Sequence, residues 1–364
     1  MIQDAFHDPD TGSIIYWVRP HVGEEAEYSD EEGSDSGDSM SSDDTITSSE
    51  ARDYFYEFNG RLFVDSPDVP IWYPADMEQK SGACHQLYKL VYGGNHFGPM
   101  SQVLCSWTES RPRVLDMCTQ DGSWVQEMSQ EFPNVDFVSL DVAPMVHHVP
   151  RKNIIFEVYD IQHEILEPDE SFDLVRMAYT SEMLKDIRTL ITEAQRVLKP
   201  GGLLCIFERE LAIYDTKDLR RPSESTPWTN RVVDAMRSSL LLQGAQIETW
   251  RLMEGWLASD SGLWEGRGSG VPPFERITKG LEIVHAGGWD ADFSRQGIRL
   301  LMAQLATVTL RNMGPMLSLT KMDSRNISQL VDNAIEEVRD LRTQYALKQH
   351  HLFAYKPLTP CCQN

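Results

Sequence analysis

The pattern of apolar and polar residues changes at about residue 113. From there to residue 208, short apolar runs typical of buried strands alternate with segments of helical period. The predicted strands cover 113–117, 136–142, 154–159, 172–177 and 203–208, and the clearest helices between them cover 123–132 and 185–198. Apolar strands separated by helices predict a mostly parallel sheet with both faces covered, which is the doubly wound α/β fold.

The segments on either side of this alternation predict additions to the sheet. Before it, Asn59-Gly60 between two aromatic-rich runs predicts a hairpin, and a helical pattern ends at Gly93. After it, the pattern predicts helices over 228–243, 293–313 and 326–348 and strands over 276–289 and 350–357. We therefore expect a leader over 1–50, an N-terminal hairpin and helical cap over 51–112, and a main domain over 113–364 with substrate-binding insertions at about 210–228 and 252–280.

Charge limits the classes of partner. The chain has 364 residues and a net charge of −23, and residues 23–50 contain eleven acids with no lysine or arginine. This Ser-rich acidic leader has little to bury, so we expect it to be disordered, with acid-flanked serines open to kinases. The rest of the chain is still too acidic for a phosphate backbone, which argues against a nucleic-acid partner.

Other motifs point to an ordinary intracellular protein. No run approaches the ~20 apolar residues of a membrane span, and the first residues lack a secretory signal, so we expect no membrane partner and a cytoplasmic or nuclear location. The six cysteines show no zinc-ligand spacing, and the pairs His147-His148 and His350-His351 point to opposite faces of a strand. We predict no metal site.

Three acids stand at the ends of three successive predicted strands, Asp116, Asp141 and Asp160. Each has an ordinary interpretation as a solvated loop residue or a helix cap, but a doubly wound sheet brings all three to one rim, where ligands bind. A carboxylate in the position of Asp141 accepts both hydroxyls of a ribose, which favours a nucleoside-containing cofactor.

The turn after the first strand distinguishes between cofactors. Dinucleotide enzymes place a glycine triplet there, whereas this chain reads Val114 to Trp124 as VLDMCTQDGSW, with an acid at Asp116 and a single glycine at Gly122. The carboxylate would repel a pyrophosphate and attract a cation such as the sulfonium and α-ammonium of S-adenosylmethionine. An NAD-type oxidoreductase is therefore disfavoured.

The stretch VLDMCTQDGSW, together with VDFVSLDVAP, IIFEVYDIQ, SFDLVRMA and EAQRVLKPGGLLCIFE, resembles the class I S-adenosylmethionine-dependent methyltransferases. More narrowly, it is similar to the fungal group that includes TAM-type methyltransferases and velvet-associated regulators of secondary metabolism. The resemblance runs from about residue 48 to the closing FAYKP. It implies a Rossmann-like sheet of seven strands, the last of them antiparallel.

The resemblance also implies site residues. It places Asp116, Cys118 and Gly122 in the turn that binds the methionine end of the cofactor, and Asp141 on the ribose. It implies that Asp160 and Ile161 bind the adenine. It also implies that Met177, Ala178 and Tyr179 line the mouth of the methyl-donor pocket.

The turn departs from the pattern of that family, approximately D-x-G-T-G-T-G-x-W, because Cys118 and Gln120 replace glycines. We therefore expect an S-adenosylmethionine-dependent methyltransferase acting on a small molecule of fungal secondary metabolism, or else a weakly catalytic or inactive regulatory binding protein with a protein partner.

No catalytic base stands out from the sequence. Candidates are Glu208 and Glu210 at the end of the fifth strand, Tyr179 and His96. A structural or solvent-facing role is the ordinary alternative for each of them.

Overall fold

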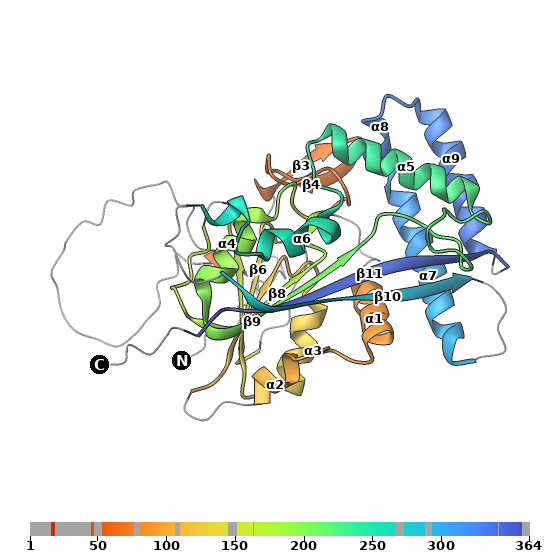
Figure 1. Ribbon diagram of the computed structural model, residues 1–364. Coiled ribbons are helices and arrows are strands. Elements are labelled where there is room, and N and C mark those ends of the chain that lie inside the picture. Colours follow the sequence, from red (N-terminus) through yellow and green to blue (C-terminus); the bar gives the residue numbers. More distant parts are fainter. Residues whose placement is uncertain are drawn as a thin grey trace, which may run out of the picture.

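A nine-stranded sheet with helices on both faces forms the body of the computed structural model (Figure 1). The structure describes residues 16–18, 45–46, 53–75, 81–105, 110–144, 151–162, 164–265, 273–287, 293–340 and 342–358. The strand order is β10-β11-β9-β8-β5-β6-β7-β1-β2. The seven strands from β10 to β7 make the predicted Rossmann-like sheet, and β1 and β2 extend its edge.

The predicted strands of the central sheet are confirmed. They are β5 (Arg113–Met117), β6 (Asp136–Asp141), β7 (Ile154–Val158), β8 (Phe172–Ala178) and β9 (Leu198–Arg209), all parallel. Most of their side chains are buried on both faces, which explains the continuous apolar runs in the sequence, although Ile155 of β7 is exposed. The strand β9 begins earlier than predicted, at Leu198, and includes the Lys-Pro-Gly-Gly segment that follows it.

The C-terminal strand β11 (Gln344–Tyr355) runs antiparallel between β9 and β10 (Glu275–Gly287). This confirms the expected antiparallel closing strand but corrects the predicted helix over 326–348. The helix α9 (Ser324–Arg339) ends at Asp340, whose backbone is extended, and the chain enters β11 four residues later. Pairing with two long strands overrides the helical pattern of residues 344–348.

Helices cover the two faces of the sheet with separate apolar clusters. One face carries α1 (Ser81–Tyr92), α2 (Met100–Cys105) and α3 (Ser123–Glu131). The other carries α4 (Arg188–Val197) and α6 (Thr249–Leu257), with a short 3-10 turn at Gly262–Trp264. The helix α6 was not predicted.

A third group of helices lies beyond the carboxyl end of β9. It consists of α5 (Pro227–Leu242), α7 (Phe293–Asn312), α8 (Gly314–Ser318) and α9, grouped at one end of the molecule in Figure 1. A separate apolar cluster joins these helices to Trp72. They form a cap over the part of the sheet where β9 ends and the antiparallel β11 begins.

The N-terminal residues contribute little described structure. The hairpin of β3 (Phe55–Phe58) and β4 (Arg61–Val64) is confirmed, and both turn residues, Asn59 and Gly60, have positive φ. Within the leader, only β1 (Tyr16–Val18) and β2 (Thr45–Ile46) are described, and they were not predicted. The rest of the acidic, Ser-rich leader lies outside the described residues, as do His147 and His148.

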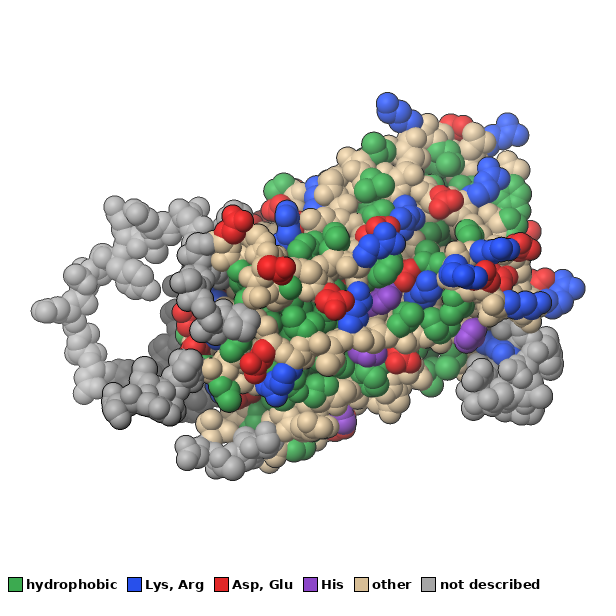
Figure 2. Space-filling model, viewed as in Figure 1, with side chains coloured by type: hydrophobic (Ala, Val, Ile, Leu, Met, Phe, Trp, Pro, Cys, Tyr) green, Lys and Arg blue, Asp and Glu red, His purple; other side chains and the backbone are tan. Residues whose placement is uncertain are grey.

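The surface is mixed in charge. On the face shown in Figure 2, Lys and Arg side chains lie mainly over the end of the molecule that carries α5, α7 and α9, with acidic side chains among them. Within the described part of the chain, no helix combines the length and apolarity needed to cross a membrane.

Candidate functional site

The turn between β5 and α3 keeps the backbone of a glycine-rich loop without its glycines. Cys118, Gln120 and Gly122 all have positive φ, at 57°, 57° and 66°. A side chain in this left-handed region costs about 1–2 kcal/mol per residue. The family's alternating glycine positions are therefore preserved in conformation, while two of the three carry strain.

This loop is fastened to Asp141 at the end of β6. The carboxylate accepts hydrogen bonds from the backbone N–H of Gln120 and of Val142, both at 2.8 Å. Burial raises the pKa of Asp141 to about 7, although both hydrogen bonds oppose the shift. Each carboxylate oxygen keeps a further lone pair, so the group can still accept a ribose hydroxyl.

Asp116 is not the free anion that the sequence suggested. Its Oδ1 accepts a hydrogen bond from Arg176 of β8 at 2.6 Å, and the carboxylate is fully buried. The guanidinium of Arg176 also lies 4.2 Å above the ring of Trp124. Since this pair is neutral as a whole, Asp116 does not supply a net negative charge for a sulfonium or an ammonium group.

The remaining cofactor candidates lie where the strand ends predict. Asp160 and Ile161 directly follow β7, and the carboxylate of Asp160 accepts the backbone N–H of Gln162 at 2.9 Å. Ile161 is fully buried, as is Met177 near the end of β8. The fold thus brings Asp141, Asp160 and Ile161 to the same rim as the loop.

Two of the catalytic candidates hold the turn after β8. Glu208 accepts hydrogen bonds from Thr180 Oγ1 at 2.9 Å and from Ser181 Oγ at 2.5 Å. It has no exposed surface, and burial raises its pKa to about 7. Tyr179 has positive φ and donates its hydroxyl to Gln349 of β11 at 3.3 Å. Glu208 is placed as a positioning residue and Tyr179 as a link between β8 and β11.

The other two candidates lie in different surroundings. Glu210 is bound by His350 Nε2 at 2.7 Å and by the hydroxyl of Tyr214. His96 faces Glu131 at 3.1 Å, at the end of α3 that lies away from the loop. His96 is therefore remote from the carboxyl ends of the strands.

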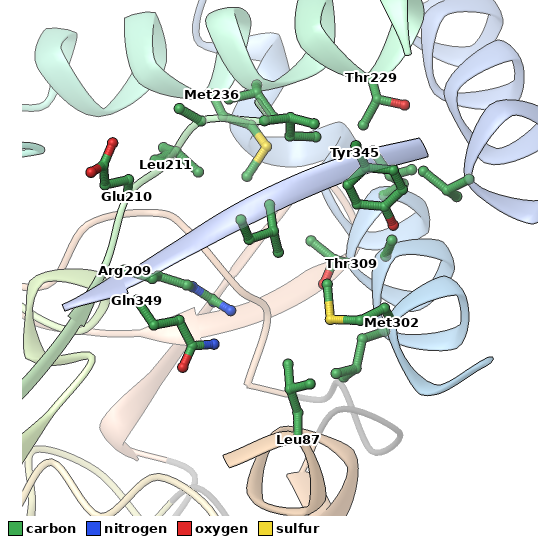
Figure 3. A pocket seen from close by; sticks show the side chains of 18 of the residues that line it. Leu87, Arg209, Glu210, Leu211, Thr229, Met236, Met302, Thr309, Tyr345 and Gln349 are labelled. Atoms are coloured by element: carbon green, nitrogen blue, oxygen red, sulfur yellow. The ribbon is translucent and has the colours of Figure 1, made fainter. Parts of the chain in front are cut away.

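An apolar cavity of about 130 Å³ lies between the sheet and the helical cap (Figure 3). Its walls come from α1, α5, α7, α9, β11 and the residues after β9. The predicted substrate-binding insertion at about 210–228 contributes residues 210–213, and the N-terminal segment contributes Tyr73 and Leu87, whereas the described residues of 252–280 contribute none. Figure 3 shows Arg209 and Gln349 together near one end of the cavity and Tyr345 near the other.

Sequence reasoning missed three residues of the site, Arg176, Arg209 and Gln349. A charge inside the apolar run of β8 was a signal for Arg176, because a buried charge requires a partner. Arg209 and Gln349 carried no such signal. They are brought side by side only by the pairing of β9 with β11.

Comparison with known proteins identifies the family to which this geometry corresponds. Residues 100–239 match the family model described as a methyltransferase domain. The chain carries a class I methyltransferase domain. The matched region contains β5, the substituted loop, Asp141 and the start of the cap.

Similarity to two fungal proteins covers more of the chain than the matched domain does. The secondary metabolism regulator laeA of Coprinopsis cinerea is 25% identical over 301 residues, which cover 80% of this chain and 71% of laeA. The methyltransferase pytC of Aspergillus terreus is 22% identical over 258 residues, 70% of this chain and 73% of pytC. These matches confirm the predicted class I S-adenosylmethionine-dependent methyltransferase, with fungal relatives that include a regulator of secondary metabolism.

One solved structure is similar in outline. Phosphoethanolamine N-methyltransferase 2 of Haemonchus contortus, in complex with S-adenosyl-L-methionine, is 16% identical and covers 77% of this chain and 58% of that one, with a TM-score of 0.38. So low a TM-score carries no weight for substrate or mechanism.

The residues at the strand ends fit S-adenosylmethionine in most respects. The loop conformation, the carboxylate of Asp141 with lone pairs to spare and the apolar Ile161 suit a nucleoside. The exception is the methionine end, where Arg176 compensates Asp116. The fit is therefore good for adenosine and altered in charge for the amino acid part.

Proposed function

We propose that this methyltransferase transfers the methyl group of S-adenosylmethionine to a small-molecule acceptor of fungal secondary metabolism. The observation that carries the proposal is the apolar cavity beside the ends of β9 and β11, which Gln349 joins to Tyr179 at the end of β8. A concave, mostly apolar site with a few polar groups is typical of small ligands. The relative laeA, a secondary metabolism regulator, supports the metabolic setting, and the methyltransferase pytC supports the reaction.

The cofactor supplies an electrophilic methyl group on a sulfonium. The chain's own residues would bind and orient it: Asp141 would accept the ribose hydroxyls, and Asp160 and Ile161 would hold the adenine. Gly122 and the strained Cys118 would shape the turn at the methionine end. Binding both molecules side by side and excluding water accounts for most of the rate that a protein can add to such a displacement.

The turn after β8 would keep this arrangement in place. Glu208 anchors Thr180 and Ser181, and the next residue, Glu182, pairs with Arg209 at the cavity. These contacts connect the β8 turn to the cavity wall. We therefore assign Glu208 a positioning role and no proton transfer.

A second candidate function rests on the same loop. Strain at Cys118 and Gln120 and the compensated charge of Asp116 favour weak cofactor binding, as in a regulatory protein that has lost turnover. In that case a protein partner, rather than a small molecule, would be the target.

The proposal also includes the location of the protein, its domain boundaries and its class of partner. We infer a cytoplasmic or nuclear protein divided at about residues 50 and 112, without a nucleic-acid partner. The net charge of −23 supports the last point.

Comparison of metabolites tests the proposed acceptor. Extracts of strains with and without the protein would be compared by mass spectrometry, with a strain expressing Asp141→Ala as the matched control. We expect a pair of compounds that differ by one CH₂ unit, with the methylated member absent from the deletion and from Asp141→Ala. Identical metabolites in all strains would favour the regulatory candidate.

A further inference from the structure

The cavity is the size of one ring. An engineered cavity of about 150 Å³ lined by aliphatic side chains binds benzene, and this one is about 130 Å³. Its walls are mainly aliphatic, with Leu87, Val233, Met236, Met302 and Leu305 among them. The space therefore suits a single six-membered ring or a short branched chain.

Arg209 and Gln349 supply hydrogen-bonding groups at the end of the cavity nearest β8, and Thr229, Thr309 and Tyr345 lie at the other end (Figure 3). Arg209 and Gln349 are direct neighbours across β9 and β11, and both line the cavity. The carbonyl oxygen of Gln349 accepts the hydroxyl of Tyr179, while its amide nitrogen makes no hydrogen bond to the described residues. Gln349 thus offers an N–H donor to an oxygen atom of a ligand.

The charges around the cavity are already compensated. Arg209 Nη2 donates to Glu182 at 2.6 Å and to the hydroxyl of Tyr73 at 3.1 Å. Glu210 is paired with His350 and lies 3.8 Å from Lys348. A carboxylate or an ammonium group on the ligand would be desolvated without a free counter-charge, so both are disfavoured.

We propose that the cavity binds the neutral apolar part of the methyl acceptor, a ring or short branched chain, with a hydroxyl group at the Gln349 end. This rests on the proposed function, since it takes the cavity as the acceptor site. It adds the chemical class: an uncharged alcohol or phenol rather than an acid or an amine.

Three probes that share one fluorinated benzene ring separate the alternatives. They are 4-fluorophenol, 4-fluorotoluene and 4-fluorobenzoate, observed by ¹⁹F NMR with the full chain, with and without S-adenosylmethionine. We expect 4-fluorophenol to bind with a dissociation constant on the order of 1 mM, a usual strength for eight heavy atoms. The other two should bind more weakly by at least about threefold. Tighter binding of 4-fluorobenzoate would overturn the proposal.

Substitutions on one helix locate the binding. Leu305→Trp fills the cavity, and Leu300→Trp adds the same ring to α7 at a position 59% exposed. We expect Leu305→Trp, and the milder Ala306→Leu, to weaken the binding of 4-fluorophenol at least about tenfold. Leu300→Trp should leave this binding unchanged. Equal binding by all variants would overturn the assignment.

The polar end has its own test. Gln349→Leu removes the amide and keeps the size, so the preference for 4-fluorophenol over 4-fluorotoluene should disappear; an undiminished preference would contradict the role of Gln349. S-adenosylmethionine binding serves as the independent readout. If the native chain binds S-adenosylmethionine but not 4-fluorophenol, only the inference about the cavity is refuted. If it binds neither compound, the proposed function is refuted as well.

Discussion

The strained backbone at Gln120 leads us to expect that glycine stabilises the protein at this position, although substitution by glycine is usually destabilising. Gln120 has φ of 57° and is partly exposed, so replacing its side chain leaves no large cavity. Relief of the left-handed backbone gives about 1–2 kcal/mol. The greater freedom of glycine in the unfolded chain removes about 0.5–1 kcal/mol of that gain. We expect Gln120→Gly to stabilise the chain by about 0.5–1 kcal/mol.

Chemical denaturation of the full chain measures this difference directly. Gln120→Ala is the matched control, because it removes the side chain and keeps the strained backbone. We expect Gln120→Gly to unfold at higher denaturant than Gln120→Ala with the same slope, and to melt about 1–3 °C higher. The reasoning is refuted if Gln120→Gly is no more stable than Gln120→Ala.

Three further predictions follow from other contacts. Because the pKa of Asp141 is raised to about 7, adenosine should bind roughly tenfold more tightly at pH 8 than at pH 6. Calorimetry that shows no pH dependence of adenosine binding would contradict this. The same raised pKa makes the contribution of Asp141 to stability greatest below about pH 4, and this contribution is lost as the pH rises towards 7. Arg176→Met leaves the buried Asp116 without its partner and should lower the free energy of unfolding in urea by about 3–5 kcal/mol. Adding Asp116→Asn should recover much of this stability. A double variant no more stable than Arg176→Met would contradict the importance of the ion pair. Glu337 accepts two backbone N–H groups at the start of α5, so Glu337→Ala should lower stability by about 1–3 kcal/mol and the exposed Glu336→Ala should not, which thermal melts of both would check.

Most of the sheet could be predicted from the sequence because its strands are buried on both faces. The run at β5 was predicted with its observed bounds, and Asn59-Gly60 fixed the hairpin. The end of α9 was wrong, since the helical pattern continues into residues that strand pairing recruits to β11. Local signals were sufficient except where long-range pairing decided the structure.

The candidate site was predictable for the strand-end acids and not for their partners. Asp141 and Asp160 follow from position alone, because parallel strands end on one rim. The charge of Asp116 was misjudged because Arg176 reaches it from a strand 60 residues later. Arg209 and Gln349 became neighbours through an antiparallel pairing that no local pattern reveals. The cavity that they border was unpredictable for the same reason.

Calorimetric titration of the full chain with S-adenosylmethionine, and separately with NADH, tests the central claim most directly. The account predicts binding of one S-adenosylmethionine per chain, its loss in Asp141→Ala, its retention in His96→Ala and no binding of NADH. Absence of S-adenosylmethionine binding to the native chain, or undiminished binding by Asp141→Ala, would contradict it.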